Sequence, residues 1–166
     1  MMTVLKRALP LSSLALILLV SCSTGGYYRN SRQSGWLHSG DDRIKIVRTA
    51  ERLIGVRYKK GGVTPRGFDC SGYVMYVYRK NGVVLPRTVK SQYLAGRRIR
   101  AGRLRPGDLV FFKTSNRNRF SHVGIFVGDN RFVHAPRTGK SVSYAEINRP
   151  YWKKRFIGAV TFVRGA

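Results

Sequence analysis

The first half of the chain has the apolar spacing of α-helices. A first helix is expected to begin at Asp41 or Asp42, which are good helix caps, and to close at Gly55. Its apolar positions recur at intervals of three and four residues: Ile44, Val47, Ala50, Leu53 and Ile54.

Two further helices are expected before residue 97. The second opens at Asp69 or Cys70 and ends near the sequence KNG, with one apolar face made of Tyr73, Val74, Val77 and Tyr78. The third is the shorter segment TVKSQYLAG, which starts after Pro86. The segment YKKGGVTPRG contains adjacent glycines and a proline, so a loop is expected between the first two helices.

The pattern changes to that of β-strands after residue 105. The sequence PGDLVFF predicts a turn followed by a strand over 109–112. In SHVGIFVGDNRFVHA two apolar runs flank the turn GDN, which predicts a hairpin, and KSVSYAEI and RFIGAVTFV supply two more strands. Helices followed by antiparallel strands indicate an α+β domain, and no repeat or second domain is evident.

The N-terminus has the pattern of an export signal. Lys6 and Arg7 precede an uncharged apolar stretch, residues 8–20, which is shorter than the ~20 residues of a typical spanning helix. Ser21 before Cys22, in LVSC, resembles a bacterial lipobox. The resemblance implies cleavage before Cys22 and lipid attachment to its sulfur. The alternative is an ordinary signal peptide that contains a cysteine.

These features suggest three parts. Residues 1–21 are expected to be a lipoprotein signal peptide, residues 22–42 a flexible tether rich in serine and glycine, and residues 43–166 the folded domain. Ser23 after the lipidated cysteine permits sorting to the outer membrane. The expected location is the bacterial envelope, with the domain lipid-anchored to the outer membrane and facing the periplasm.

Charge is the unusual feature of the composition. Lys and Arg total 32 against 7 acidic residues, a net charge of +25, which implies an anionic partner or surface. Export argues against nucleic acid and favours envelope polyanions such as lipid headgroups, lipopolysaccharide phosphates and wall carboxylates. The cluster RRIRAGRLR, residues 97–105, could steer the domain onto them. The alternative is a solvated basic surface.

Cys70 is the candidate nucleophile. If Cys22 carries lipid, Cys70 cannot form an intramolecular disulfide. A helix N-terminus favours its thiolate, and an imidazole can remove its proton. His122 and His134 lie at the far ends of the expected hairpin strands, so they can be neighbours. The hypothesis is a triad in which Cys70 attacks, His122 is the base and His134 orients the His122 ring. The Cys70 N–H could stabilise the oxyanion.

Alternative interpretations of the same residues stay open. A cysteine on a helix face is often a small buried hydrophobe, and a lone histidine can be an ordinary strand residue. One Cys and two His could in principle bind a metal, but their spacing matches no finger pattern, so no metal or cofactor is expected.

Several segments together resemble the NlpC family of papain-like cell-wall cysteine peptidases. They are GVRYKKGGVTPRGFDCSGYV, LPRTVKSQ, LRPGDLVFF and SHVGIFVGDNRFVHA, within residues 43–163. The resemblance implies a papain-like fold in which Cys70 is the nucleophile, His122 the base and His134 the third polar residue. One departure is Tyr73, where leucine is more common.

The resemblance also implies a substrate pocket and a reaction. Tyr58, Asp69 and Ser71 match positions that line the pocket in this family, although Asp69 and Ser71 could instead cap a helix and Tyr58 could be core. The implied function is peptidoglycan endopeptidase action on stem peptides, by a monomer. The rival functions are a papain-like amidase or acyltransferase, and a non-catalytic envelope-binding lipoprotein.

Overall fold

The computed structural model describes residues 40–164. The expected signal peptide, Cys22 and most of the expected tether lie outside the described residues. The last three residues of the expected tether, 40–42, belong to the first helix.

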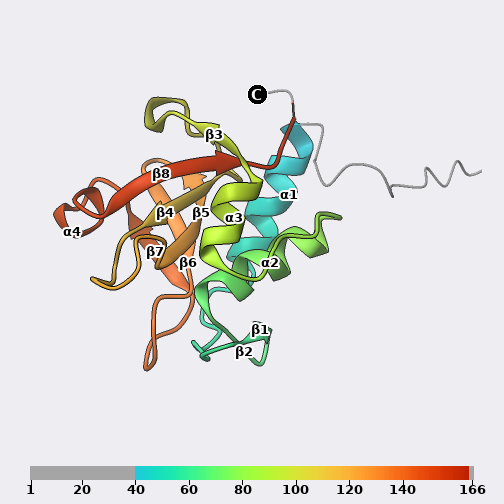
Figure 1. Ribbon diagram of the computed structural model, residues 1–166. Helices are drawn as coiled ribbons and strands as arrows, with labels where there is room; N and C mark the ends of the chain where they lie inside the picture. Colours follow the sequence, from blue (N-terminus) through green and yellow to red (C-terminus); the bar gives the residue numbers. More distant parts are fainter. Residues whose placement is uncertain (1–39, 165–166) are drawn as a thin grey trace, which may run out of the picture. The chain divides into compact units, whose positions relative to one another are not determined.

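The helices are grouped early in the chain and the strands follow, as expected for an α+β domain (Figure 1). The helices are α1 (Gly40–Glu51), α2 (Cys70–Lys80), α3 (Val89–Ala95) and the one-turn α4 (Pro150–Lys153), with a 3-10 turn η1 at Ala101–Arg103. Neither η1 nor α4 was predicted. No helix within residues 40–164 is long and apolar enough to cross a membrane.

The strands form a six-stranded antiparallel sheet. Its strand order is β3-β8-β4-β5-β6-β7, and the strands are β3 (Arg97–Ile99), β4 (Leu109–Phe112), β5 (His122–Gly128), β6 (Arg131–His134), β7 (Ser143–Glu146) and β8 (Phe156–Thr161). A separate small ribbon pairs β1 (Val63–Thr64) with β2 (Gly67–Phe68), inside the segment expected to be a loop.

The inward face of α1 differs from the predicted one. Ile46 and Ala50 are fully buried, whereas Ile44 is 52% exposed and Ile54 is 40% exposed. Asp41 and Asp42 lie within the first turn of the helix, where their charge suits the positive end of the helix dipole.

The buried side of α1 also carries a charge. The Arg43 guanidinium donates to the Asp108 carboxylate at 2.7 Å, to the Pro106 carbonyl at 2.9 Å and to the Thr161 hydroxyl at 3.2 Å. Asp108 precedes β4 and Thr161 ends β8. A buried ion pair with these extra hydrogen bonds is satisfied, so it fixes α1 against the sheet.

The central strand β4 is buried on both faces, which explains its unbroken apolar run. Leu109 and Phe111 face the helices, together with the predicted apolar face of α2, which is fully buried. Val110 and Phe112 face the opposite side, where Trp152 of α4 packs against them. The core therefore has two parts, one on each side of the sheet.

The hairpin of β5 and β6 turns at the predicted position. Asp129 and Asn130 both have positive φ angles, 50° and 58°. This geometry matches the right-handed twist of hairpin strands and suits Asp and Asn better than most residues. The turn sets the register that pairs Ile125 with Val133, so the two histidines fall near the far end of the hairpin.

Candidate active site

Cys70 is the first residue of α2, as predicted. Asp69 is the N-cap, and its carboxylate accepts a 2.7 Å hydrogen bond from the Gly72 amide. A Cβ atom at Gly72 would lie 2.0 Å from the Gly62 carbonyl oxygen, so only glycine lets the preceding loop approach the helix this closely. The segment DCSG therefore places the thiol at a capped helix end under that loop.

The thiol lies against the strand that carries His122. Amide N–H groups of Cys70, Ser71 and Val123 interact with the Cys70 sulfur and lower the pKa of the thiol. Burial and the Asp69 carboxylate act in the opposite direction and raise the pKa of Cys70 to about 11. The resting sulfur is therefore a protonated thiol, and the helix terminus alone does not ionise it. Val123, whose amide contacts the sulfur, directly follows His122 in β5.

The two histidines form one hydrogen-bonded pair. His122 Nε2 lies 2.7 Å from His134 Nδ1, and both residues are 4% exposed. The rings are perpendicular, with an interplanar angle of 89°. The predicted neighbourhood of these two side chains is therefore present in the structure.

Burial keeps both rings neutral. Desolvation lowers the pKa of His134 to about 4, and desolvation together with the His134 ring lowers the pKa of His122 well below its usual 6.5. Because His122 Nε2 is occupied by the bond to His134, Nδ1 is the ring nitrogen left to accept a proton. In that tautomer His122 Nε2–H donates to His134 Nδ1.

An aromatic side chain that sequence analysis missed covers the pair. The Trp152 ring stacks on His122, with centroids 5.5 Å apart and an interplanar angle of 29°, and meets His134 edge-on at 5.1 Å. Phe112 and Phe132 pack against Trp152 from the sheet. These rings exclude water from the histidines and so contribute to their low pKa values.

A second charged residue that sequence analysis missed is Arg87. Its guanidinium bonds both carboxylate oxygens of Asp69 and donates to the Ser71 hydroxyl at 2.9 Å. The Ser71 hydroxyl also donates to Asp69, at 3.2 Å. Asp69 is thus a helix cap, one of the open alternatives, and also part of a polar cluster beside Cys70. Arg87 lies in the quoted segment LPRTVKSQ, but no local spacing links it to Asp69.

Tyr58 lies near the same cluster. Burial raises the pKa of its phenol, with smaller contributions from Cys70 and Asp69, while Arg87 lowers it. The residue is half-buried, packs against the core and forms a single bridge with Phe68. Tyr58, Asp69, Ser71 and Cys70 therefore lie together, although Tyr58 is distant from the others along the chain.

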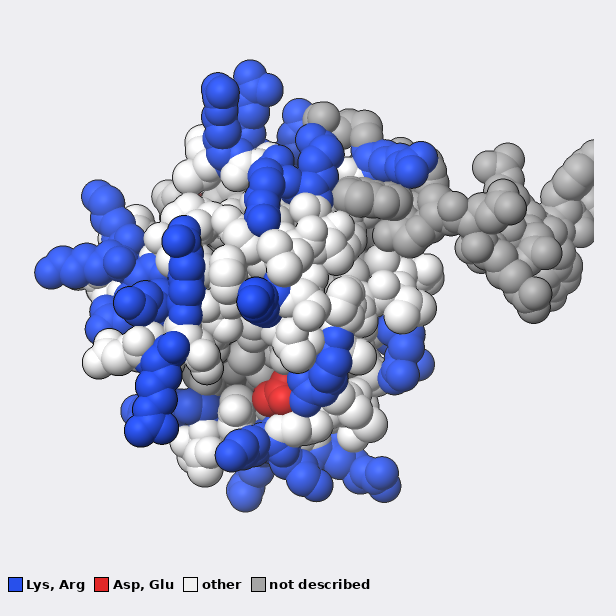
Figure 2. Space-filling view, viewed as in Figure 1, with Lys and Arg blue, Asp and Glu red and all other residues white. Residues whose placement is uncertain are grey.

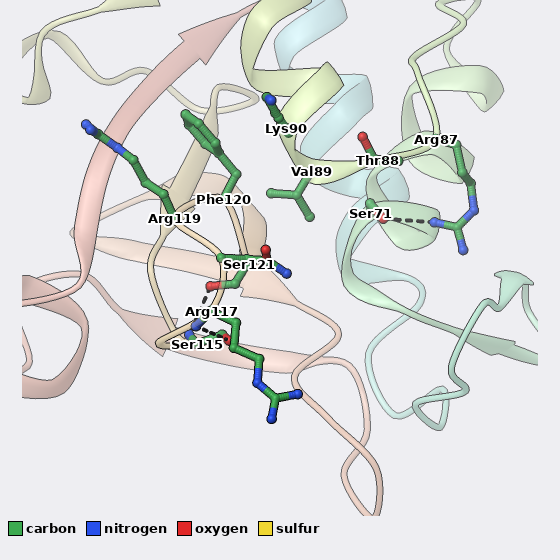
Figure 3. A pocket seen from close by; sticks show the side chains of 11 residues that line it. Ser71, Arg87, Thr88, Val89, Lys90, Ser115, Arg117, Arg119, Phe120 and Ser121 are labelled. Carbon is green, nitrogen blue, oxygen red and sulfur yellow. Dashed lines mark hydrogen bonds between the residues drawn. The ribbon is translucent and has the colours of Figure 1, made fainter.

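Three openings surround these residues. A groove of about 980 Å³ runs past Ser71 and Arg87 toward the β4–β5 loop (Figure 3). A cavity of about 460 Å³ is lined by His122 and Trp152, and one of about 490 Å³ by Arg57 and Tyr58. Within residues 40–164, no three His, Cys, Asp or Glu side chains are placed to hold a metal ion.

Comparison with known proteins shows the family of the chain. Residues 55–161 match the model of the NlpC/P60 family. The chain belongs to the NlpC/P60 family of cysteine peptidases. Its relatives include the murein DD-endopeptidase MepS/murein LD-carboxypeptidase of Escherichia coli, which is 36% identical over 170 residues, 90% of this chain and 88% of that protein. The γ-DL-glutamyl hydrolase of Bacillus subtilis is 39% identical over 121 residues, 72% of this chain but only 29% of that longer protein.

Solved structures show the same fold. An NLP/P60-family protein of Staphylococcus aureus, described as similar to lipoprotein, superposes with a TM-score of 0.69 at 35% identity, over 76% of this chain and 43% of that one. The NlpC/P60 domain of the peptidoglycan hydrolase SagA superposes with a TM-score of 0.62 at 34% identity, over 72% of this chain and 97% of that domain. The predicted papain-like α+β fold is confirmed.

Proposed function

We propose that this protein is a peptidoglycan endopeptidase that uses Cys70 to cleave amide bonds in the stem peptides of the cell wall. The observation that carries the proposal is the His122–His134 pair, held at 2.7 Å, together with the contact between the Cys70 thiol and Val123, the residue after His122. Cell-wall hydrolysis also agrees with the names of relatives that cover most of this chain, among them the murein DD-endopeptidase MepS.

The proposed reaction begins with a neutral thiol and a neutral base. His122 Nδ1 takes the Cys70 proton as the sulfur attacks the amide carbonyl carbon. The resulting imidazolium keeps its bond to His134, which holds the ring in place. The oxyanion of the tetrahedral intermediate accepts a hydrogen bond from the Cys70 N–H, which is not used by the backbone hydrogen bonds of α2 because it belongs to the first helical residue.

The second half returns the proton and frees the sulfur. The imidazolium protonates the leaving amine nitrogen, the C–N bond breaks and an acyl-enzyme thioester remains. Water, deprotonated by His122, then hydrolyses the thioester, and the carboxylic acid product leaves as the thiol regains its proton. Proton transfer uses only these side chains, so the proposal needs no cofactor or metal.

The polar cluster beside Cys70 is the proposed substrate pocket. Tyr58, Asp69 and Ser71 lie near the thiol, and Arg87 holds the latter two together. A pocket that offers a carboxylate, a phenol and a hydroxyl can bind the polar backbone of a peptide next to the scissile bond. We add Arg87 to the three pocket residues that the sequence predicted.

The proposal includes an anchored form of the enzyme. Cys22 follows a lipobox-like sequence and would carry the lipid, with residues 1–21 removed and the domain in the periplasm at the outer membrane. A related Staphylococcus aureus structure is described as similar to lipoprotein. Metabolic labelling of cells with a radioactive fatty acid tests this part, because Cys22→Ala should abolish the labelling. We further propose that the enzyme is a monomer.

Defined muropeptides test the reaction. We expect the full chain, in detergent, to cleave cross-linked or linear stem peptides, and mass spectrometry to find every sugar–lactyl–alanine bond intact. The Cys70→Ala variant should be inactive, while a matched variant at an exposed distant site, Arg48→Gln, should keep wild-type activity. Products cut between the sugar and the stem would identify an amidase. Equal digestion by Cys70→Ala would exclude cysteine catalysis altogether.

A further inference from the structure

The groove that begins at Ser71 has basic residues on both walls. One wall comes from the segment before α3 and its first turn, and includes Arg87, Thr88 and Lys90. The other wall is the β4–β5 loop, which includes Arg117 and Arg119. Figure 3 shows the two sets on opposite sides of the groove, with Arg87 and Arg119 extending outward, and no acidic residue is among the eleven that line it.

Three of the groove's positive charges have no acidic partner. Arg87 is paired with Asp69. The ion pairs among residues 40–164 do not involve the other three, Lys90, Arg117 and Arg119, which we term the cationic rim. All three are exposed. The face in Figure 2 shows Lys and Arg side chains widely spread, with little acidic surface between them.

Local hydrogen bonds hold both walls in place. The Ser121 hydroxyl accepts the Thr114 amide at 2.7 Å and the Ser115 amide at 3.1 Å, which closes the base of the β4–β5 loop. On the opposite wall the Thr88 hydroxyl accepts the Ser91 amide at 3.2 Å and caps α3, which carries Lys90. The cationic rim is therefore presented by two braced segments.

The shape and lining of the groove suit a peptide. At about 980 Å³ it lies near the upper end of the usual range for ligand pockets, and Val89 and Phe120 add apolar surface between its polar groups. Because Ser71 belongs both to this groove and to the cluster beside Cys70, one end of the groove lies at that cluster.

We infer that the cationic rim binds free carboxylates of the stem peptide and makes the enzyme prefer acidic stems over amidated ones. The inference rests on the proposed function, because it takes the substrate to be an acidic peptide. Each exposed cation interacts weakly with a carboxylate in water, so the preference comes from three charges together and is sensitive to salt.

A matched pair of substrates tests the inference. One is a synthetic stem peptide with free carboxylates, and the other is the same peptide with those carboxylates converted to amides. We expect the wild-type kcat/KM to favour the free acid by about fivefold to tenfold, mainly through KM, and added NaCl to reduce that ratio. Lys90→Gln/Arg117→Gln/Arg119→Gln should bring the ratio close to one.

The control variant removes the same charge elsewhere. Arg48→Gln/Arg52→Gln/Arg100→Gln changes three exposed basic residues, none of which lines the groove, and should keep the wild-type ratio. An unchanged ratio in the rim variant, or an equal loss in the control, would overturn the assignment. So would stronger inhibition by inorganic phosphate than by glutarate at equal ionic strength, which would assign the rim to phosphate polymers.

A binding measurement separates this inference from the proposed function. If the wild type cleaves neither peptide, the proposed function fails, and calorimetry with the Cys70→Ala variant still compares affinity for the two peptides. Tighter binding of the free acid, lost in the rim variant combined with Cys70→Ala, supports the carboxylate site. Equal affinity for both peptides would show that the cationic rim is not a carboxylate site.

Discussion

His122 Nε2 and His134 Nδ1 lie 2.7 Å apart in a pair shielded by the Trp152 ring. The bond to His134 therefore leaves Nδ1 as the ring nitrogen of His122 that can accept a proton. This relationship makes His134 a positioning residue in the proposed reaction. Loss of its ring should lower the rate of proton transfer by His122 and leave substrate binding unchanged.

The His134→Ala variant is the first test. We expect kcat to fall by about 100-fold with little change in KM, within the range of general acid–base contributions. His134→Asn should retain more activity, because its amide oxygen can still accept a hydrogen bond from His122. The measurement is steady-state kinetics on a stem peptide. A variant that folds normally but changes only KM would contradict the positioning role.

Burial of the histidine pair should make stability depend on pH. The pKa of His134 is about 4 in the folded protein and about 6.5 when unfolded, so the unfolded chain binds more protons between those values. Stability is therefore fully present above pH ~6.5 and falls as the pH drops toward 4, where the loss from His134 reaches about 3 kcal/mol. Urea unfolding across this range measures the change.

A variant isolates the contribution of that residue. His134→Gln cannot titrate, so its stability should fall less steeply below pH 6.5 than that of the wild type. Identical slopes in the two proteins would show that His134 is not buried neutral.

Trp152 should control the protonation of the pair. In Trp152→Ala, water reaches both rings, so their pKa values should rise toward 6.5 and the acid limb of kcat/KM should move to higher pH. We also expect a loss of about 3 kcal/mol in unfolding free energy from the lost packing. Trp152→Phe keeps an aromatic ring and should shift the limb less. If the acid limb of kcat/KM in Trp152→Ala stays at the wild-type pH, Trp152 does not control the protonation of the histidines.

Asp69 should suppress ionisation of the resting thiol. Asn also caps helices well, so Asp69→Asn removes the charge that raises the Cys70 pKa and leaves α2 capped. The rate of iodoacetamide alkylation at pH 8 should rise, by about tenfold for each unit that the pKa falls. Asp129→Asn, in the exposed hairpin turn, is the matched control and should alkylate at the wild-type rate.

The sequence predicted those parts of the fold that depend on interactions between neighbouring residues. The cap at Asp69, the hairpin turn at Asp129 and the apolar run of β4 each follow from neighbouring residues, and each is present. Sequence alone placed Ile44 on the inward face of α1, whereas the structure leaves Ile44 exposed and buries Arg43, which pairs with Asp108. Such a pair cannot be recognised before the fold brings its members together.

The residues of the candidate site also fall into those that the sequence predicted and those that only the fold reveals. Cys70, His122 and His134 could be proposed because a lone thiol at a helix start and two imidazoles on one hairpin are chemically conspicuous. Arg87 and Trp152 could not, since their importance comes from contacts with Asp69, Ser71 and the histidines, which are distant in sequence. β3 carries arginines without apolar alternation, so only its pairing with β8 identifies it as a strand.

The Arg43 contacts have a mechanical consequence. Any pull transmitted through the chain ahead of residue 40 enters the domain at α1, where the guanidinium joins Asp108 and Thr161 at two neighbouring strands. The same helix is also bonded to α2, because the Tyr73 hydroxyl donates to the Ala50 carbonyl at 3.0 Å. A force on α1 is therefore shared between the sheet and the helix that presents Cys70.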